Sequence, residues 1–119
     1  MAKFDVQSAY RLLPVQGEDS ICLGPTIVGQ IFTDKMLPMG AKTGAAHWEA
    51  FGHLWKWMVQ NASQFHGSIC RYVDNMLCVF QPDSDPTCSI TALEVVCAEI
   101  GLPLAPNRKT LKLGDELSL

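Results

Sequence analysis

The sequence lacks the features that mark several large classes of protein. No stretch approaches the roughly 20 consecutive apolar residues of a membrane span. The N-terminal segment has no apolar core like that of a secretory signal. The five cysteines form no C-x-x-C pair, which argues against a zinc site and against a disulfide framework. We therefore expect an intracellular protein of a reducing compartment, cytoplasmic or nuclear, with no membrane partner.

An excess of basic residues is also missing. The chain has 9 Lys and Arg against 12 Asp and Glu, a net charge of −3, which disfavours a free-standing nucleic-acid binder. This objection weakens if the chain is one piece of a larger protein whose basic parts lie elsewhere. A length of 119 residues with 48% hydrophobic residues predicts one globular domain with a core of its own.

The apolar and turn-forming residues predict an alternation of strands and helices. The segment "KFDV" is typical of a short strand, and residues 15–33 of a hairpin whose strands lie around 21–23 and 26–33. "QSAYRLLPV" predicts a helical or turn segment, and "QGEDS" a polar turn. A helix is expected from Ala45 to Gln64, with Thr43 as its cap and one apolar stripe facing the core: Trp48, Phe51, Trp55 and Met58.

A second hairpin, "SICRYV" and "MLCVF", is expected around Asp74 and Asn75. Another helix follows, with Asp85 at its N-cap, and it ends at Gly101. The tail "TLKLGDEL" predicts a last pair of short strands. Without the first hairpin the order is β-α-β-β-α-β, the ferredoxin-like α+β arrangement. Its first strand and central hairpin are neighbours in one antiparallel sheet, so Asp5 and Asp74 are expected to approach each other.

Four short motifs give the chain a family resemblance. In order they are "FDVQSAY", "LPMG", "YVDN" and "IGLPLAPNRKT". Their order and spacing resemble the palm motifs of retroelement reverse transcriptases, most of all the DIRS-type and gypsy-like retrotransposon enzymes. The resemblance extends from residue 3 to about residue 117. It implies a single palm domain over residues 1–119, with residues 15–33 as a partial fingers hairpin and with most of the fingers, the thumb and RNase H outside the chain.

The resemblance implies RNA-directed DNA polymerase activity, the transfer of dNTPs to a primer 3′-hydroxyl on a template-primer. This nucleotidyl transfer uses two Mg²⁺ or Mn²⁺ ions about 4 Å apart, which carboxylate oxygens hold. By resemblance Asp5 and Asp74 are the bridging catalytic ligands, and Asn75 and the backbone carbonyl of Val6 complete the metal site. The implied partners are the template-primer, dNTPs and the remainder of the retrotransposon polyprotein.

Further roles also follow only from the resemblance. Tyr10 occupies the position of the steric gate against a nucleotide 2′-hydroxyl, and Met39 and Gly40 lie in the nucleotide-binding loop. Lys109 matches the basic catalytic residue at the departing pyrophosphate, although Arg108 fits nearly as well. The segment around Leu113 and Gly114 resembles the primer grip.

The sequence also departs from the family pattern. Asn75 replaces the second aspartate of Y-x-D-D, and it keeps an oxygen ligand but loses a unit charge. Ala45 stands where the family has proline. The alternative interpretation is therefore a catalytically inactive palm-like domain: a decayed element product, or a module retained for binding nucleic acid or protein.

Two other patterns carry no site. His47 and His53 are six residues apart and do not share a helix face well, which disfavours a metal pair. The segment "GAKTG" does not satisfy the spacing of a phosphate-binding P-loop.

Overall fold

The computed structural model of the chain describes residues 1–81, 83–106 and 109–110, and its fold is α+β. The chain forms two compact units, and each is described by itself below. The first contains Met1–Gln7 and Phe51–Leu119, and the second contains Ser8–Ala50. The described helices include none that is long and apolar enough to cross a membrane.

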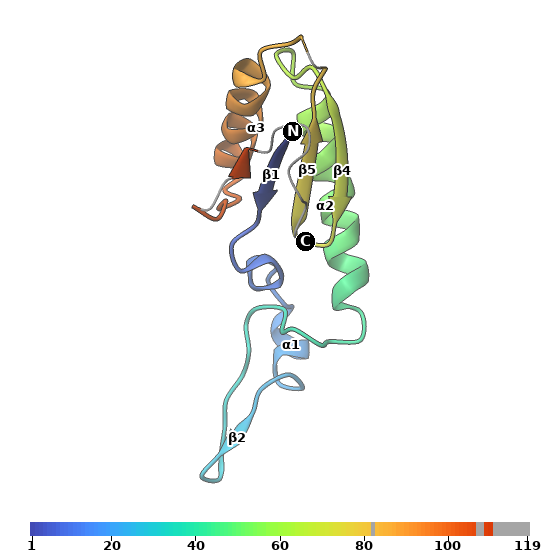
Figure 1. The fold of residues 1–119 in the computed structure, drawn as a ribbon. Coiled ribbons are helices and arrows are strands. Elements are labelled where there is room, and N and C mark those ends of the chain that lie inside the picture. Colours follow the sequence, from blue (N-terminus) through green and yellow to red (C-terminus); the bar gives the residue numbers. More distant parts are fainter. Residues whose placement is uncertain (82, 107–108, 111–119) are drawn as a thin grey trace. The chain divides into compact units, whose positions relative to one another are not determined.

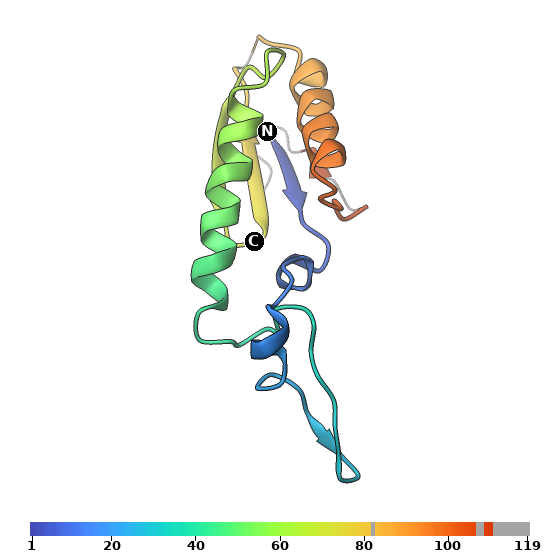
Figure 2. The ribbon, with the colours of Figure 1, turned by 180° about the vertical axis from the view of Figure 1, so that it is seen from behind.

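A four-stranded antiparallel sheet forms the first unit, in the order β4-β5-β1-β6. Its strands are β1 (Ala2–Asp5), β4 (Ser68–Tyr72), β5 (Asn75–Val79) and β6 (Lys109–Thr110). Residues 51–60 of helix α2 (Gly44–Gln60) and helix α3 (Thr87–Glu99) lie on one face of this sheet (Figures 1 and 2). The other face of the sheet carries neither helix, and we call it the open face.

The core lies between the sheet and the two helices. Alternate strand residues point to the helices and are buried, among them Phe4, Ile69 and Met76. From the helices, Trp55 and Leu93 are fully buried. The Trp55 indole N–H lies 3.2 Å from the Cys97 sulfur, which gives this polar group a partner inside the core. Of the predicted helix stripe, Trp48 and Trp55 are buried and Phe51 and Met58 are half-buried.

Helix α2 ends at Gln60, four residues before the predicted end. The Asn61 amide makes the last four-residue helical bond, to the Trp57 carbonyl (3.0 Å), and its side chain donates to the same carbonyl (2.8 Å). The next amide, of Ala62, donates to the carbonyl of Val59, three residues back, so the helix tightens and stops.

Helix α3 ends as predicted but begins one residue later, because Pro86 and not Asp85 occupies the N-cap position. The Asp85 carboxylate accepts hydrogen bonds from the Thr87 hydroxyl (2.6 Å) and the Thr87 amide (2.9 Å), and these bonds hold the pKa of Asp85 below its ordinary value. At the other end Gly101 has a φ of 71°. Leu102 donates to the Cys97 carbonyl and Gly101 to the Ala98 carbonyl, which is the bonding of a Schellman cap.

The second unit contains a 3₁₀ helix η1 (Ala9–Leu12), a short helix α1 (Gly17–Ser20) and the hairpin of β2 (Thr26–Ile27) with β3 (Gln30–Ile31). The prediction of a strand around residues 21–23 is wrong. The Cys22 and Leu23 amides donate to carbonyls three residues back, at Asp19 and Ser20, so this segment extends the turn of α1. Acidic residues in the first turn of α1 favour a helix there in place of the predicted polar turn.

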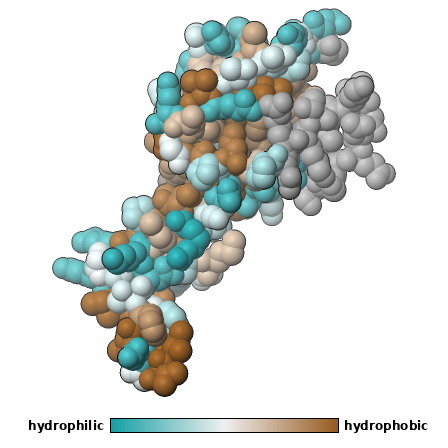
Figure 3. Space-filling view, turned by 90° about the vertical axis from the view of Figure 1, so that its left-hand side faces the viewer, coloured by the Kyte–Doolittle hydropathy of each residue, from teal (hydrophilic) through white to brown (hydrophobic). Residues whose placement is uncertain are grey.

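The single strand predicted over residues 26–33 is also wrong, because this segment turns back on itself and forms the β2–β3 hairpin within residues 26–31. Its two turn residues, Val28 and Gly29, both have positive φ, 48° and 73°, as a type I′ turn requires. The hairpin exposes four large apolar side chains, and apolar surface is visible at the lower end of Figure 3. They are Ile27, Val28, Ile31 and Phe32.

Thiol labelling tests which cysteines are buried in the core. All five cysteines are free, and Cys22, Cys70 and Cys88 are exposed whereas Cys78 and Cys97 are buried. Burial raises the pKa of Cys78 to about 12 and that of Cys97 to about 11, so neither forms a reactive thiolate near neutral pH. We expect iodoacetamide at pH 8 to modify three thiols in the folded chain and all five in denaturant, counted by mass spectrometry. Fast modification of all five in the folded chain would contradict this core.

Candidate functional site

The register of β1 against β5 brings the site residues together. Asp5 is the direct partner of Asn75, and Phe4 is the partner of Met76. One residue beyond the strand, the Val6 amide donates to the Asp74 carbonyl (3.1 Å). Asp5 and Asn75 therefore form a non-hydrogen-bonded pair, the kind in which opposite side chains lie closest, with Cβ atoms about 4.5–5.5 Å apart.

Strand alternation sets the face on which these side chains lie. Phe4 and Met76 are buried toward the helices, so their neighbours Asp5 and Asn75 belong to the open face. Asp5 is exposed and Asn75 is half-buried. On β4 the partner of Asn75 is Tyr72, whose side chain is 70% exposed. Asp5, Asn75 and Tyr72 thus form one row across three strands of the open face.

Asp74 lies in the turn that joins β4 to β5. The two turn residues are Val73 and Asp74, because Tyr72 pairs with Asn75. The prediction that Asp74 and Asn75 both lie at the tip is therefore wrong by one residue, since Asn75 is the first residue of β5. The Asn75 side-chain amide donates to the Asp74 carboxylate (3.2 Å).

The backbone of this turn is strained at Val73. Its φ of 52° lies in the left-handed region, whereas the φ of Asp74 is not positive. A positive φ at the first turn residue alone is typical of a type II′ turn, a position that favours glycine. A β-branched residue in this region costs on the order of 1–2 kcal/mol. The sequence gives no signal for this strain, because valine normally predicts the middle of a strand.

The donor set offers hard oxygen ligands, but few of them. Asp5 and Asp74 contribute carboxylates and Asn75 an amide oxygen, which are ligand types that Mg²⁺ and Mn²⁺ accept. Among residues 1–81 and 83–106, no three or more His, Cys, Asp or Glu side chains gather in a way that could hold a metal ion. The described residues thus offer two carboxylates and one amide by chemical type, and the roles of Asp5, Asp74, Asn75 and the Val6 carbonyl as metal ligands stay predictions.

The predicted nucleotide-binding residues belong to the second unit. The ring of Tyr10 packs on that of Trp48, with centroids 5.9 Å apart. Met39 is 78% exposed, and Gly40 has a φ of 89°, which favours glycine at this position. Asp5 and Asp74 belong to the first unit, so the grouping of Tyr10, Met39 and Gly40 around them stays a prediction.

The C-terminal site residues are described only in part. The backbone of Lys109 pairs with Lys3, which makes β6 the neighbour of β1. The predicted role of the Lys109 side chain stays a prediction. Arg108, Leu113 and Gly114, and with them the predicted primer grip and final strand pair, lie outside the described residues.

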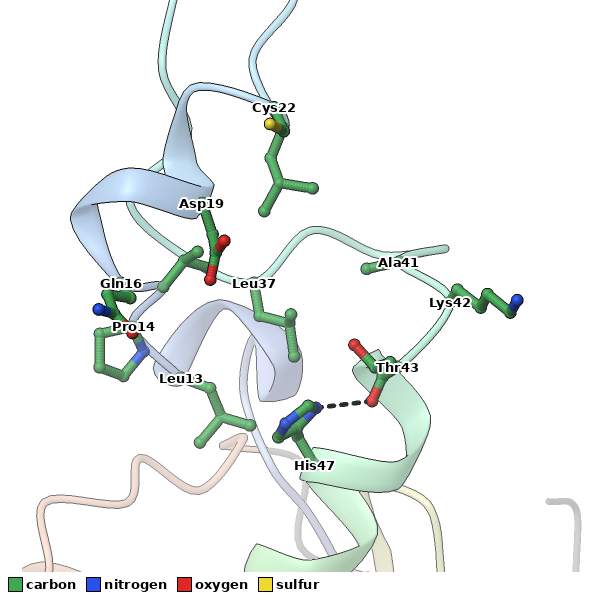
Figure 4. A pocket seen from close by; sticks show the side chains of 12 residues that line it. Leu13, Pro14, Gln16, Asp19, Cys22, Leu37, Ala41, Lys42, Thr43 and His47 are labelled. Atoms are coloured by element: carbon green, nitrogen blue, oxygen red, sulfur yellow. Dashed lines mark hydrogen bonds between the residues drawn. The ribbon is translucent and has the colours of Figure 1, made fainter.

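A cavity of about 650 Å³ lies within the second unit (Figure 4). Its walls include the apolar side chains of Leu13 and Leu37 and the polar side chains of Asp19 and His47. The Nδ1–H of His47 donates to the Thr43 carbonyl (2.8 Å), which fixes the tautomer of the ring. Sequence reasoning missed this cavity, because its walls come from two separate segments, residues 13–23 and 37–47, and share no motif.

Comparison with known proteins adds no family assignment. The chain matches no protein-family model. It also matches no curated protein.

Replacement of Val73 tests the strained turn. Glycine adopts a positive φ without steric cost, so we expect Val73→Gly to raise the free energy of unfolding by about 1 kcal/mol in urea denaturation. Leu77→Gly is the matched control, since the same loss of a side chain inside a strand should destabilise the protein. Equal destabilisation by both replacements would show that Val73 is not strained.

Proposed function

We propose that the chain is the palm of a retroelement reverse transcriptase, an RNA-directed DNA polymerase domain. The order and spacing of its four motifs support this proposal. So does the sheet: β1, β4, β5 and β6 in the order β4-β5-β1-β6, with helices on one face, is the arrangement expected of a ferredoxin-like β-α-β-β-α-β fold. The β2–β3 hairpin between β1 and α2 corresponds to the proposed fingers-like insertion.

One observation carries the proposal: the pairing of Asp5 with Asn75, next to Asp74 in the turn. These residues come from two motifs about 70 residues apart in the sequence. Asp5 and Asn75 lie side by side on the open face at one end of the β1–β5 pair, and Asp74 lies in the adjoining turn. Neighbouring carboxylates at a strand end are what a divalent cation site requires.

In this proposal Asp5 and Asp74 hold the cations, and Asn75 adds a neutral oxygen. Two bound Mg²⁺ or Mn²⁺ ions would supply activation of the primer 3′-hydroxyl and stabilisation of the leaving pyrophosphate. The residues of the chain orient the reacting groups: Tyr10 as the gate against a 2′-hydroxyl, Met39 and Gly40 beside the nucleotide, and Lys109 as the cation near pyrophosphate.

A second candidate function is a palm-like module that binds nucleic acid or protein without catalysis. The bond from the Asn75 amide to the Asp74 carboxylate favours it, because a donor here uses one of the oxygens that a cation needs. A net charge of −3 also gives the chain little general attraction for phosphate. The two candidates differ in whether the site binds divalent cations and supports synthesis.

Metal titration of the chain tests the proposed site. We expect Mn²⁺ to broaden the amide NMR signals of Asp5, Val6 and Asp74 first, and Asp74→Ala to abolish this effect. Asn75→Asp should tighten Mn²⁺ binding on the order of tenfold, because it adds a unit charge to the ligand set. Glu99→Gln removes a charge from an exposed position on α3. This variant is the control and should leave the Mn²⁺ affinity unchanged.

Primer extension separates the two candidate functions. The substrate is a labelled DNA primer on an RNA template with dNTPs and Mg²⁺ or Mn²⁺, and the protein is the chain fused to fingers and thumb segments. Polymerase function predicts extension that Asp74→Ala removes. If the fusion extends no better than Asp74→Ala, and Asn75→Asp does not restore synthesis, the binding-module function is the correct one.

A further inference from the structure

Arg71 connects the turn that carries Asp74 to helix α2. It lies on β4 one residue before Tyr72, and its alternation with exposed Cys70 and Tyr72 directs it to the helix side of the sheet. Its guanidinium donates to the backbone carbonyl of Val73 (2.6 Å). This bond holds the first residue of the turn, which is the residue with the left-handed φ.

Gly52 provides the surface on which this guanidinium lies. Gly52 is buried in α2, and a Cβ at this position would overlap the Arg71 guanidinium. Glycine inside a helix is otherwise unfavourable, so the close approach of Arg71 gives a physical reason for it. The planar guanidinium thus fits between the helix backbone and the turn, a geometry that the ammonium group of lysine does not reproduce.

We propose that Arg71 and Gly52 form a clamp that positions Asp74 for cation binding. Arg71 acts through the Val73 carbonyl: the bond holds Val73 in its strained conformation, and this conformation in turn sets the position of Asp74, the next residue of the turn. The proposal rests on the proposed function only for the role of the cation. The clamp itself is a property of the turn and is measured without metal.

Electrostatics alone predicts the opposite effect of Arg71. A cationic side chain three residues from Asp74 repels a divalent cation, so its removal would strengthen cation binding if charge were its only influence. The clamp requires that removal weakens binding, because Asp74 loses its fixed orientation. The sign of the change therefore distinguishes positioning from simple charge.

The test measures Mn²⁺ affinity of the chain by NMR titration in matched variants. We expect Arg71→Gln to weaken Mn²⁺ binding by about tenfold and Arg71→Lys to weaken it less. Lys35→Gln removes the same charge from an exposed position and should leave affinity within about twofold. Affinity that is unchanged or higher in Arg71→Gln would overturn the clamp.

Gly52→Ala tests the second half of the clamp with Arg71 left in place. Alanine is the better helix former, so the fold should persist, and the added methyl should displace the flexible end of Arg71. We expect weaker Mn²⁺ binding at an undiminished thermal midpoint. The same Mn²⁺ affinity as the parent chain would show that the contact with Gly52 has no positioning role.

A measurement without metal separates failure of the clamp from failure of the proposed function. A residue with φ near 52° has a short distance between its amide and α protons, and so a strong NOE between them. We expect this NOE at Val73 in the parent chain and its loss in Arg71→Gln and Gly52→Ala. If the NOE behaves as expected and no variant binds Mn²⁺, the clamp stands and the proposed function fails. If the NOE is unchanged in both variants, the clamp fails.

Rescue provides the last control. Glycine adopts a positive φ without help, so Val73→Gly should make the turn less dependent on Arg71. We expect the double variant Val73→Gly/Arg71→Gln to bind Mn²⁺ more tightly than Arg71→Gln alone. Equal affinities would mean that Arg71 does not act through the conformation of Val73.

Discussion

The pairing of β1 with β5 is the constraint on which the rest of the site depends. β1 lies between β5 and β6, so its register sets the alignment of both of these neighbouring strands. With Phe4 opposite Met76, the apolar residues face the helices and Asp5 faces away. A slip of one residue would turn Asp5 into the core and Phe4 to solvent, and burial of an unpaired carboxylate is costly. The hydrophobic pattern of the strand therefore places the proposed site.

The side of the sheet that faces the helices forms the core, and a residue on this side also contacts the turn between β4 and β5. Ile69 and Arg71 both lie on the helix side of β4. Ile69 is within the core, and Arg71 lies against Gly52 of α2. Helix α2 is thus more than a cover for the sheet, because its buried Gly52 lies against the Arg71 side chain, which donates to the Val73 carbonyl. The Arg71 side chain thus links the packing of α2 to the conformation of the turn.

The sequence predicted the elements better than their ends. The approach of Asp5 to the β4–β5 hairpin followed from element order, because few topologies fit it. The Schellman cap at Gly101 followed from local chemistry. The predicted strand around residues 21–23 is wrong. Three apolar residues in a row do not reveal that the amides of Cys22 and Leu23 donate hydrogen bonds to carbonyls of α1. The left-handed φ of Val73 and the role of Gly52 depend on contacts between distant segments, which local patterns do not encode.

Asn75 has opposite effects on the stability of the β4–β5 hairpin and on cation binding at the proposed site. Its amide donates a hydrogen bond to the Asp74 carboxylate, so the turn is satisfied by the protein alone. An aspartate at the same position would place two carboxylates next to each other, which repel unless a cation lies between them. Asparagine therefore stabilises the hairpin without metal, and it lowers the negative charge that the proposed site would offer to a cation. Both effects come from one exchange of a charged oxygen for an N–H donor, which is why the two proposed functions diverge at this residue.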